Sequence, residues 1–462
     1  MNSQFAPLED YQTLLAKIDM PLITQYISIH EIKSVIAACQ AKEKRLRRLP
    51  AWLVVLLSIM KGIYCRESWP AVFAKICLIP CFQTGFNLAK LPDKSALCLA
   101  RYRLGVRPMV MLFKTICRPF ATEGTPGAFL YGFRLVAIDG TYETIADTEH
   151  NASYFGRHRN GKGREDSAFP QFQAFFLSEC STHVIFDAVI TPFRSNQHKY
   201  FRRLLRSVTA DMLLMFDRGL FSYDSFRAMH DKNIPFLTPA RRDMKLEPVR
   251  YLSDGSFIAH IKSWKNNGWN KDPVVPVRVV SYTLDDPVRN PEKQTFRLIT
   301  SLMDPTLYDA MTLIATYHQR WEIEIAIDEI DTHQRLPWVP FRSQKPVGVI
   351  QEFYSLLLAY FVLCVVRFES ALALDQSPQR LSFINTLRLI QHLGPISQMY
   401  GNAFHFQLLP LIHQWQAYFQ LPPRENRINP RVVKRKRNKF RRKKRSDKSI
   451  LVAPIEEVVR LV

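Results

Sequence analysis

The sequence feature that most constrains the fold is a series of short apolar segments between residues 131 and 240. Each is bounded by turn-forming residues, which is the pattern of a buried strand, and two segments between them carry apolar residues at helical spacing. The strands are predicted at 134–138, 172–177, 183–191, 212–216 and 235–239, and the helices at 195–207 and 222–230. This order of three strands, helix, strand, helix and strand predicts an α/β fold.

Two of these strands run directly into an aspartate. The first is followed by Asp139-Gly140 and the fourth by Asp217-Arg218-Gly219. Either aspartate alone would more often be a turn residue than a ligand. Together with the strand order, however, they match a ribonuclease H-like core, which has carboxylates at the ends of its first and fourth strands.

A long amphipathic helix is predicted from about residue 306 or 308 to Arg335, just before Pro337. At about 100° per residue, one face is wholly polar and spans an arc of about 80°. This face holds Tyr317, Arg320, Glu324, Asp328 and Asp331. A separate apolar face, suited to packing on a sheet, holds Ile323, Ala326, Ile327 and Ile330. A solvated polar face is the ordinary interpretation, but Tyr and Arg beside a carboxylate are also residue types that contact phosphates.

Three carboxylates, Asp139, Asp217 and Glu324, form the candidate catalytic and metal-binding site. Carboxylate oxygens are ligands that Mg2+ and Mn2+ prefer, so we expect these residues to hold such ions, two of them in a two-metal site. In two-metal phosphoryl transfer, one ion activates the attacking water or hydroxyl and the other stabilises the leaving oxygen. The pattern therefore predicts chemistry on phosphodiesters.

The net charge of +22, from 63 Lys and Arg against 41 Asp and Glu, indicates a polyanionic partner. More than half of it lies between Arg424 and Lys448, where 14 basic residues accompany two acidic ones. On its own, such a tail is equally compatible with ribosomal, nucleoid and membrane-surface contacts. The rest of the chain carries a net charge of +10, so it also favours an anionic partner.

Composition also excludes several classes of protein. Hydrophobic residues make up 47% of the chain, which is enough for real cores and excludes disorder for most of it. We expect a cytoplasmic, nucleoid-associated protein with no membrane segment, because no leader pattern opens the chain and its longest uncharged runs, 49–60 and 353–366, are too short. Eight scattered cysteines without a Cys-x2-Cys pair predict free thiols rather than a zinc site.

Periodicity divides the chain into six regions. Residues 1–125 are predicted to be helical, and their basic clusters fit either a DNA-binding domain or a generic helical domain. Breaks are expected there at Pro50, Pro70, Pro80, Pro92 and Pro108. The other regions are the first part of the core (131–240), an inserted β subdomain (241–304), the core helix with Glu324 (305–345), C-terminal helices (346–423) and the basic tail (424–462).

Three motifs follow one another along the chain: Ile138-Asp139-Gly140-Thr141, Phe216-Asp217-Arg218-Gly219 and Tyr317-x2-Arg320-x3-Glu324. Together they resemble the DDE transposases of bacterial insertion sequences, in the branch of the insertion-sequence-four family marked by Tyr-x2-Arg-x3-Glu-x6-Lys. The similarity covers nearly the whole chain, including Arg47-Arg48-Leu49-Pro50 and the Ala168-Phe-Pro-Gln171 entry to the second strand.

The resemblance implies a metal-dependent enzyme that cuts and joins DNA, with terminal inverted repeats and target DNA as partners and a homodimer in the synaptic complex. In relatives, cleavage passes through a hairpin at the transposon end, and a Trp from the β insertion supports a flipped base. The DNA contacts expected here are Tyr317, Arg320, Arg218, Arg335 and one of Trp264 and Trp269.

One position departs from the signature, because Asp331 stands where Lys is expected. Either Arg335, on the same helical face, substitutes for that Lys, or this copy is impaired. On the first view, Asp331→Lys would raise DNA-end binding or cleavage. Two other interpretations stay open: another ribonuclease H-like nuclease, and a catalytically impaired relative that acts as a DNA-binding protein.

Overall fold

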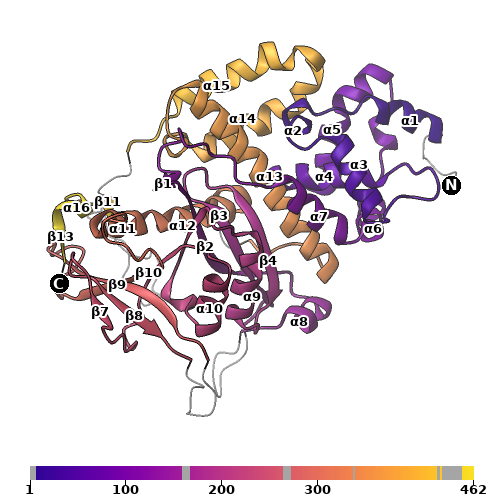
Figure 1. The fold of residues 1–462 in the computed structure, drawn as a ribbon. Coiled ribbons are helices and arrows are strands. Elements are labelled where there is room, and N and C mark those ends of the chain that lie inside the picture. Colours follow the sequence, from indigo (N-terminus) through magenta and orange to yellow (C-terminus); the bar gives the residue numbers. More distant parts are fainter. Residues whose placement is uncertain are drawn as a thin grey trace. The chain divides into compact units, whose positions relative to one another are not determined.

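The computed structural model describes residues 7–158, 167–263, 272–336, 339–423, 427–428 and 450–461. The chain forms two compact units, each built from segments that are distant in sequence (Figure 1). The first unit comprises Met1–Leu130, Arg134–Ser207 and Trp321–Leu421, and the second comprises Tyr131–Phe133, Val208–Arg320 and Pro422–Val462. Both contain helices and strands, so the chain is a mixed α/β protein, as predicted.

The N-terminal part of the first unit is helical, as its periodicity predicts. Its helices are α1 (Leu8–Ala16), α2 (Pro21–Thr24), α3 (Ile29–Ala38), α4 (Ala51–Ile63), α5 (Trp69–Thr84), α6 (Lys94–Leu104) and α7 (Arg107–Ile116). The expected break at Pro80 is wrong, because Pro80 lies inside α5. The backbone carbonyl of Ile76, which Pro80 cannot serve, accepts a hydrogen bond from Gln398 Nε2 at 3.1 Å instead.

Three antiparallel strands form the sheet of the first unit, in the order β4 (Ile185–Pro192), β3 (Gln171–Glu179) and β2 (Phe133–Thr144). Asp139 lies opposite Phe176 of β3. The expectation that β2 ends at Asp139 is wrong, since the strand continues to Thr144 and stays paired with β3 there. This pairing satisfies the backbone groups of the additional residues. Helices α8 (Glu149–Phe155) and α9 (Gln197–Leu204) belong to the same unit.

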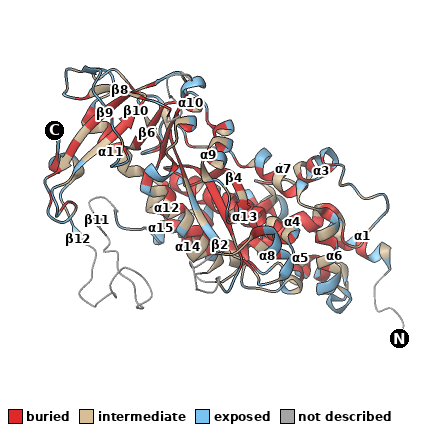
Figure 2. Cartoon of the chain, turned by 90° about the horizontal axis from the view of Figure 1, so that it is seen from below, coloured by how far each residue is buried: buried red, intermediate tan, exposed pale blue. Residues whose placement is uncertain are grey.

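The C-terminal helices of the first unit are α13 (Pro346–Ala373), α14 (Phe383–Ile396) and α15 (Leu409–Tyr418). Although its uncharged run is short, α13 as a whole is long and apolar enough to cross a membrane, but 83% of its most apolar stretch is buried inside the protein. Figure 2 shows α13 largely in the colour of buried residues. Gly62 permits a close approach of α4, because a Cβ there would lie 2.5 Å from the carbonyl oxygen of Ser355 on α13.

The second unit contains a sheet with the order β5-β6-β10-β9-β8-β7. The strands are β5 (Met212–Phe216), β6 (Phe236–Pro239), β7 (Arg250–Tyr251), β8 (Phe257–Ile261), β9 (Val275–Leu284) and β10 (Thr295–Thr300). Strands β5 and β6 are parallel and are connected by α10 (Tyr223–Asp231). Strand β10 pairs antiparallel with β6, so the strands between residues 241 and 304 continue this sheet.

The predicted long helix is regular only in part. It consists of α11 (Ala310–Tyr317), a 3-10 turn (His318–Arg320), α12 (Trp321–Asp328) and a π-helical segment (Glu329–Arg335). A π-helix has more residues per turn than an α-helix, so residues after Asp328 rotate away from the positions that a uniform 100° step gives them. The basic tail lies mostly outside the described residues.

Candidate active site

Asp139 is half-buried in the middle of β2, on the same side of the strand as Glu143. Its Oδ1 accepts a hydrogen bond from the backbone N–H of Gly140 at 2.7 Å. Glycine is required after Asp139, because a Cβ on Gly140 would lie 2.9 Å from Cδ1 of Phe175. The Asp-Gly pair therefore allows β3 to pack closely beside the carboxylate.

Glu324 is half-buried on α12, in the same unit as Asp139. Two residues of the predicted apolar face, Ile323 and Ala326, are fully buried, and α12 packs against β3. Strand β3 lies next to β2 in the sheet. The helix with Glu324 and the strand with Asp139 are thus both held against β3.

A buried histidine holds the opposite side of α12. His183, in the turn between β3 and β4, is fully buried, with Nε2 2.7 Å from Oε2 of Glu322 and Nδ1 3.1 Å from Oε2 of Glu329. The two glutamates are separated by about two helical turns, so one imidazole bridges them. Glu322 and Glu324 are about 200° apart on the helix, so this bridge lies on the side of α12 opposite Glu324.

Glu329 connects this bridge to α13. Its Oε1 accepts a hydrogen bond from Arg367 Nη1 at 2.6 Å, and its Oε2 accepts one from the Tyr360 hydroxyl at 2.7 Å. Burial opposes ionisation, but Arg367 and His183 hold the pKa of Glu329 below its usual range. The pKa of His183 is raised despite burial, because Glu329 and Glu322 favour the charged imidazolium. Sequence reasoning missed this network, since its members are far apart in the chain.

Asp217 lies in the second unit, directly after β5, and is exposed. Its Oδ1 accepts a hydrogen bond from the backbone N–H of Arg218 at 2.8 Å. Tyr317 and Arg320 lie in the same unit, and the Arg320 guanidinium carbon is 5.9 Å from the centre of the Tyr317 ring. Burial raises the pKa of the Tyr317 phenol, Arg320 lowers it and the Asp217 charge raises it, with a net increase. The charges of Asp217 and Arg320 therefore both act on the Tyr317 phenol.

Asp331, the departure from the signature, is paired inside the first unit. Only 25% of its side chain is exposed, and its carboxyl group contacts the Glu143 carboxyl group. Arg335 forms an ion pair with Glu143, and its Nη2 is 3.6 Å from Oδ1 of Asp331. The expectation that Asp331 and Arg335 share the face of Glu324 assumed a uniform helix, but the π-helical segment brings both side chains against Glu143 of β2. Asp331→Lys would break this pairing rather than add a phosphate contact.

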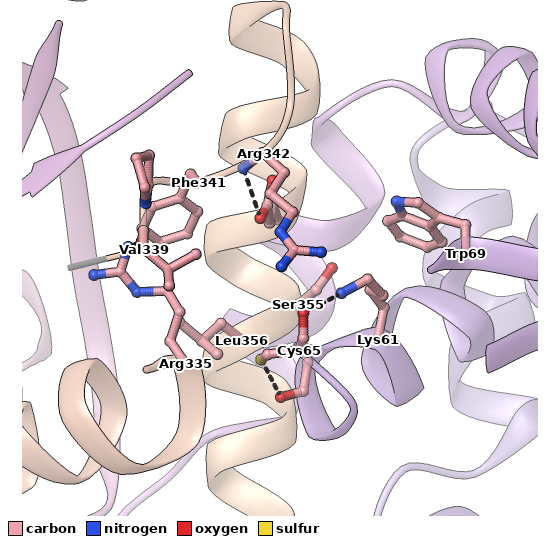
Figure 3. A pocket seen from close by; sticks show the side chains of 12 residues that line it. Lys61, Cys65, Trp69, Arg335, Val339, Phe341, Arg342, Ser355 and Leu356 are labelled. Atoms are coloured by element: carbon pink, nitrogen blue, oxygen red, sulfur yellow. Dashed lines mark hydrogen bonds between the residues drawn. The ribbon is translucent and has the colours of Figure 1, made fainter. Parts of the chain in front are cut away.

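Arg335 is further enclosed by the segment after the π-helix. Its Nη1 donates to the carbonyl of Val339 at 3.0 Å, and its guanidinium carbon lies 4.4 Å from the centre of the Phe341 ring. Figure 3 shows Arg335 beside Phe341 at the edge of a pocket that also contains Lys61 and Trp69. This pocket has a volume of about 30 Å3, which suits ordered water and not a nucleotide.

The Glu143–Asp331 pair predicts a pH dependence of stability. Burial and the nearby Asp331 charge raise the pKa of Glu143 to about 9, so the folded pair retains a proton that the unfolded chain loses above about pH 4.3. Stability conferred by that proton is present at low pH and is lost as pH rises towards 9. We expect the free energy of unfolding to fall with pH by at most about 1.4 kcal/mol per unit between pH 6 and 9.

Asp331→Asn should flatten this dependence, because Glu143 then ionises beside Arg335 and an amide. Urea unfolding at several pH values checks this, with Glu149→Gln as the control at an exposed carboxylate of the same unit. Equal slopes for wild type and Asp331→Asn would show that the two carboxyl groups do not share a proton.

The remaining candidates have different positions. Arg218 is exposed at the start of a 3-10 turn after Asp217. Trp264 and Trp269 lie outside the described residues. Among the residues that the structure describes, no three His, Cys, Asp or Glu side chains cluster closely enough to hold a metal ion by themselves. All eight cysteines are free thiols, as predicted.

Comparison with known proteins supplies the family. Residues 131–362 match the family described as Transposase DDE domain, so the chain belongs to the DDE transposases. Residues 17–114 match the Insertion element 4 transposase N-terminal domain. Within the DDE transposases, this match and the relatives described next identify the insertion element 4 family, which confirms the resemblance seen in the motifs.

Two relatives come from Escherichia coli strain K12. Transposase InsG for insertion sequence element IS4 is 24% identical over 356 residues, covering 75% of this chain and 77% of the relative. Putative transposase InsZ is 25% identical over 207 residues, covering 44% of this chain and 66% of the relative. A solved piggyBac transposase synaptic complex with hairpin DNA has a TM-score of 0.42 and 11% identity, covering 89% of this chain and 86% of that chain.

The protein is therefore a transposase, an enzyme that acts on DNA. DDE transposases generally use divalent metal ions. The family match supports a transposase over the alternative of another ribonuclease H-like nuclease.

Proposed function

We propose that this enzyme performs cut-and-paste transposition, in which it binds the terminal inverted repeats of its element, cleaves the DNA ends and joins them to target DNA. The observation that carries the proposal is the position of three acids within the matched DDE domain. Asp139 lies on a sheet strand and Glu324 on a helix held against that sheet, while Asp217 follows a buried strand of the second unit. We propose that the three meet in a ribonuclease H-like core.

The donor chemistry of these residues fits Mg2+ or Mn2+, because all three supply carboxylate oxygens. Since Mg2+ is commonly held by one or two carboxylates together with substrate phosphates, we propose that DNA completes the site. Two ions bound there would activate the attacking hydroxyl and stabilise the leaving oxygen.

Tyr317 and Arg320 are proposed to hold DNA phosphates beside Asp217. The raised pKa of Tyr317 keeps its phenol protonated, so it can donate a hydrogen bond to a phosphate oxygen. The guanidinium of Arg320 is a fork-shaped donor that matches phosphate geometry. Arg218, exposed next to Asp217, is proposed as a further phosphate contact.

A groove in the second unit offers a place for a nucleotide of the DNA end. It has a volume of about 970 Å3. Phe221, four residues after Asp217, is one of the residues that line it. Its walls carry charges of both signs, Arg241, Lys245 and Lys262 together with Asp224, Glu247 and Asp272. We also propose that a flipped base stacks on Trp264 or Trp269, which lie outside the described residues.

The same proposal gives roles in DNA binding to other parts of the chain. We propose that the helical N-terminal region recognises the inverted repeats and that the basic tail contacts DNA phosphates without sequence preference. Pairing of two transposon ends requires two active sites, so we propose a homodimer in the synaptic complex. We also propose that the enzyme acts in the cytoplasm, at the nucleoid, because its DNA substrate lies there.

Purified enzyme should cut linear DNA that carries the element's own ends, and should join the cut ends to a plasmid, only when Mg2+ or Mn2+ is present. DNA with scrambled ends is the control. Cutting of both DNAs without joining would contradict transposition and indicate a simple nuclease. Binding of the ends without any metal-dependent cutting would instead identify a catalytically impaired DNA-binding relative.

A further inference from the structure

Two helices of the first unit, α7 and α9, carry an unusual excess of positive charge. Both pack against strand β4. Residues 107–118 and 192–207, which include these helices, contain eight Lys and Arg and no Asp or Glu. Since the chain outside the tail has a net charge of only +10, these two segments contribute most of that excess.

The carboxylate of Asp187 on β4 accepts hydrogen bonds at both of its oxygens. Asp187 is buried and accepts hydrogen bonds from Nε and Nη2 of Arg206 at 2.9 and 2.7 Å. It also accepts one from the Ser207 hydroxyl at 2.7 Å and one from the backbone N–H of Ala188 at 2.8 Å. With its oxygens occupied in this way, Asp187 fixes Arg206 but has little capacity left to pair with other cations.

Lys114 on α7 and Arg203 on α9 are the nearest exposed cations. Burial, Arg206 and Arg203 lower the pKa of Lys114, while Asp187 raises it, so the charges of the two helices interact directly. In the part of the chain that the structure describes, neither Lys114 nor Arg203 makes an ion pair or a hydrogen bond through its side chain. Lys199 lies one helical turn before Arg203 and is also exposed.

We propose that the surface formed by Lys114, Lys199, Arg203 and Arg206, the α7–α9 surface, binds the phosphates of duplex DNA without reading its sequence. Phosphate groups would relieve the repulsion of Lys114 by Arg203 and Arg206, and their binding would release counterions. Lys and Arg on an exposed surface supply phosphate contacts, which position a duplex but carry no sequence information. The inference rests on the action of the enzyme on DNA and not on its cleavage chemistry.

The double variant Lys114→Gln/Arg203→Gln tests the proposal in the full-length protein. Binding to a short duplex of unrelated sequence is measured by fluorescence anisotropy at several KCl concentrations in EDTA. Loss of two phosphate contacts should reduce the slope of log K against log salt by about two, with weaker binding at every salt concentration. The matched control is Arg388→Gln/Lys293→Gln, which removes two exposed charges elsewhere and should reduce the slope much less.

Two further experiments determine which part of the DNA this surface binds. Weaker joining of pre-cut ends to a plasmid would assign it to target DNA, and weaker binding only of end fragments with long flanks would assign it to DNA outside the cut site. Both outcomes support the phosphate contact. If the double variant had the same salt slope and DNA affinity as the control variant, the proposed phosphate contact would be overturned. An acidic protein would then be the partner that the surface fits. Because EDTA prevents cleavage, this result is independent of the proposed transposition chemistry.

Discussion

Replacing Glu324 by Gln is expected to reduce metal-dependent cleavage of the element's ends by about 1,000-fold or more, with little change in DNA binding. The side chain keeps its size, so Ile323 and Ala326 still pack and α12 stays against β3. What the proposed metal site loses is one negatively charged oxygen donor. Single-turnover cleavage of end DNA in Mg2+, together with a binding assay in EDTA, measures the two effects separately.

Asp328→Asn provides the matched control for this variant. Asp328 is an exposed carboxylate four residues further along the same helix, and it hydrogen bonds to Thr332 at 2.6 Å. Its replacement removes the same charge from α12 and should change cleavage less than about threefold, as is usual for surface substitutions. Similar losses in both variants would mean that the charge of the helix, and not a specific ligand, is what cleavage requires.

Glu329→Ala is expected to lower the free energy of unfolding by about 3–5 kcal/mol. The reason is that truncation leaves the buried Arg367 guanidinium without its carboxylate partner and leaves buried His183 with Glu322 alone. It also removes the acceptor of the Tyr360 hydroxyl, which is 2.7 Å from Glu329. Urea unfolding followed by circular dichroism measures the loss.

Two comparisons separate this effect from a general loss of packing. Asp328→Ala removes an exposed carboxylate one residue away and should cost less than about 0.5 kcal/mol. Glu329→Gln keeps the volume and some hydrogen bonds but not the charge, so its cost should fall between those of the two Ala variants. If Glu329→Ala were no more destabilising than Asp328→Ala, the network would not hold α12 in place.

Much of the fold could be predicted because apolar periodicity reports directly on burial. The predicted strand at 212–216 coincides with β5, and the predicted helix at 222–230 is shifted by only one residue from α10. The errors arise where tertiary contacts override local rules. Pro80 remains inside α5 because Gln398 serves the carbonyl that it leaves unpaired, and β2 extends past Asp139 because β3 pairs with it.

The candidate site could be predicted only as far as motifs specify it. Strand-end and helix-face patterns made Asp139, Asp217 and Glu324 the candidates, although β2 continues past Asp139. The orientation of Asp331 was not, because a uniform helical step cannot anticipate the π-helical segment at Glu329–Arg335. The contact of His183 with Glu329 joins residues 146 positions apart, and no local pattern indicates it.

We propose that Asp139, Asp217 and Glu324 all ligate the metal ions of this enzyme. The most direct test is the binding of Mn2+ to the complex of the enzyme with its end DNA, followed by electron paramagnetic resonance. We expect Asp139→Asn, Asp217→Asn and Glu324→Gln each to weaken Mn2+ binding, while Asp328→Asn binds as the wild type does. If any one of the three variants retained both Mn2+ affinity and cleavage, that residue would not belong to the site.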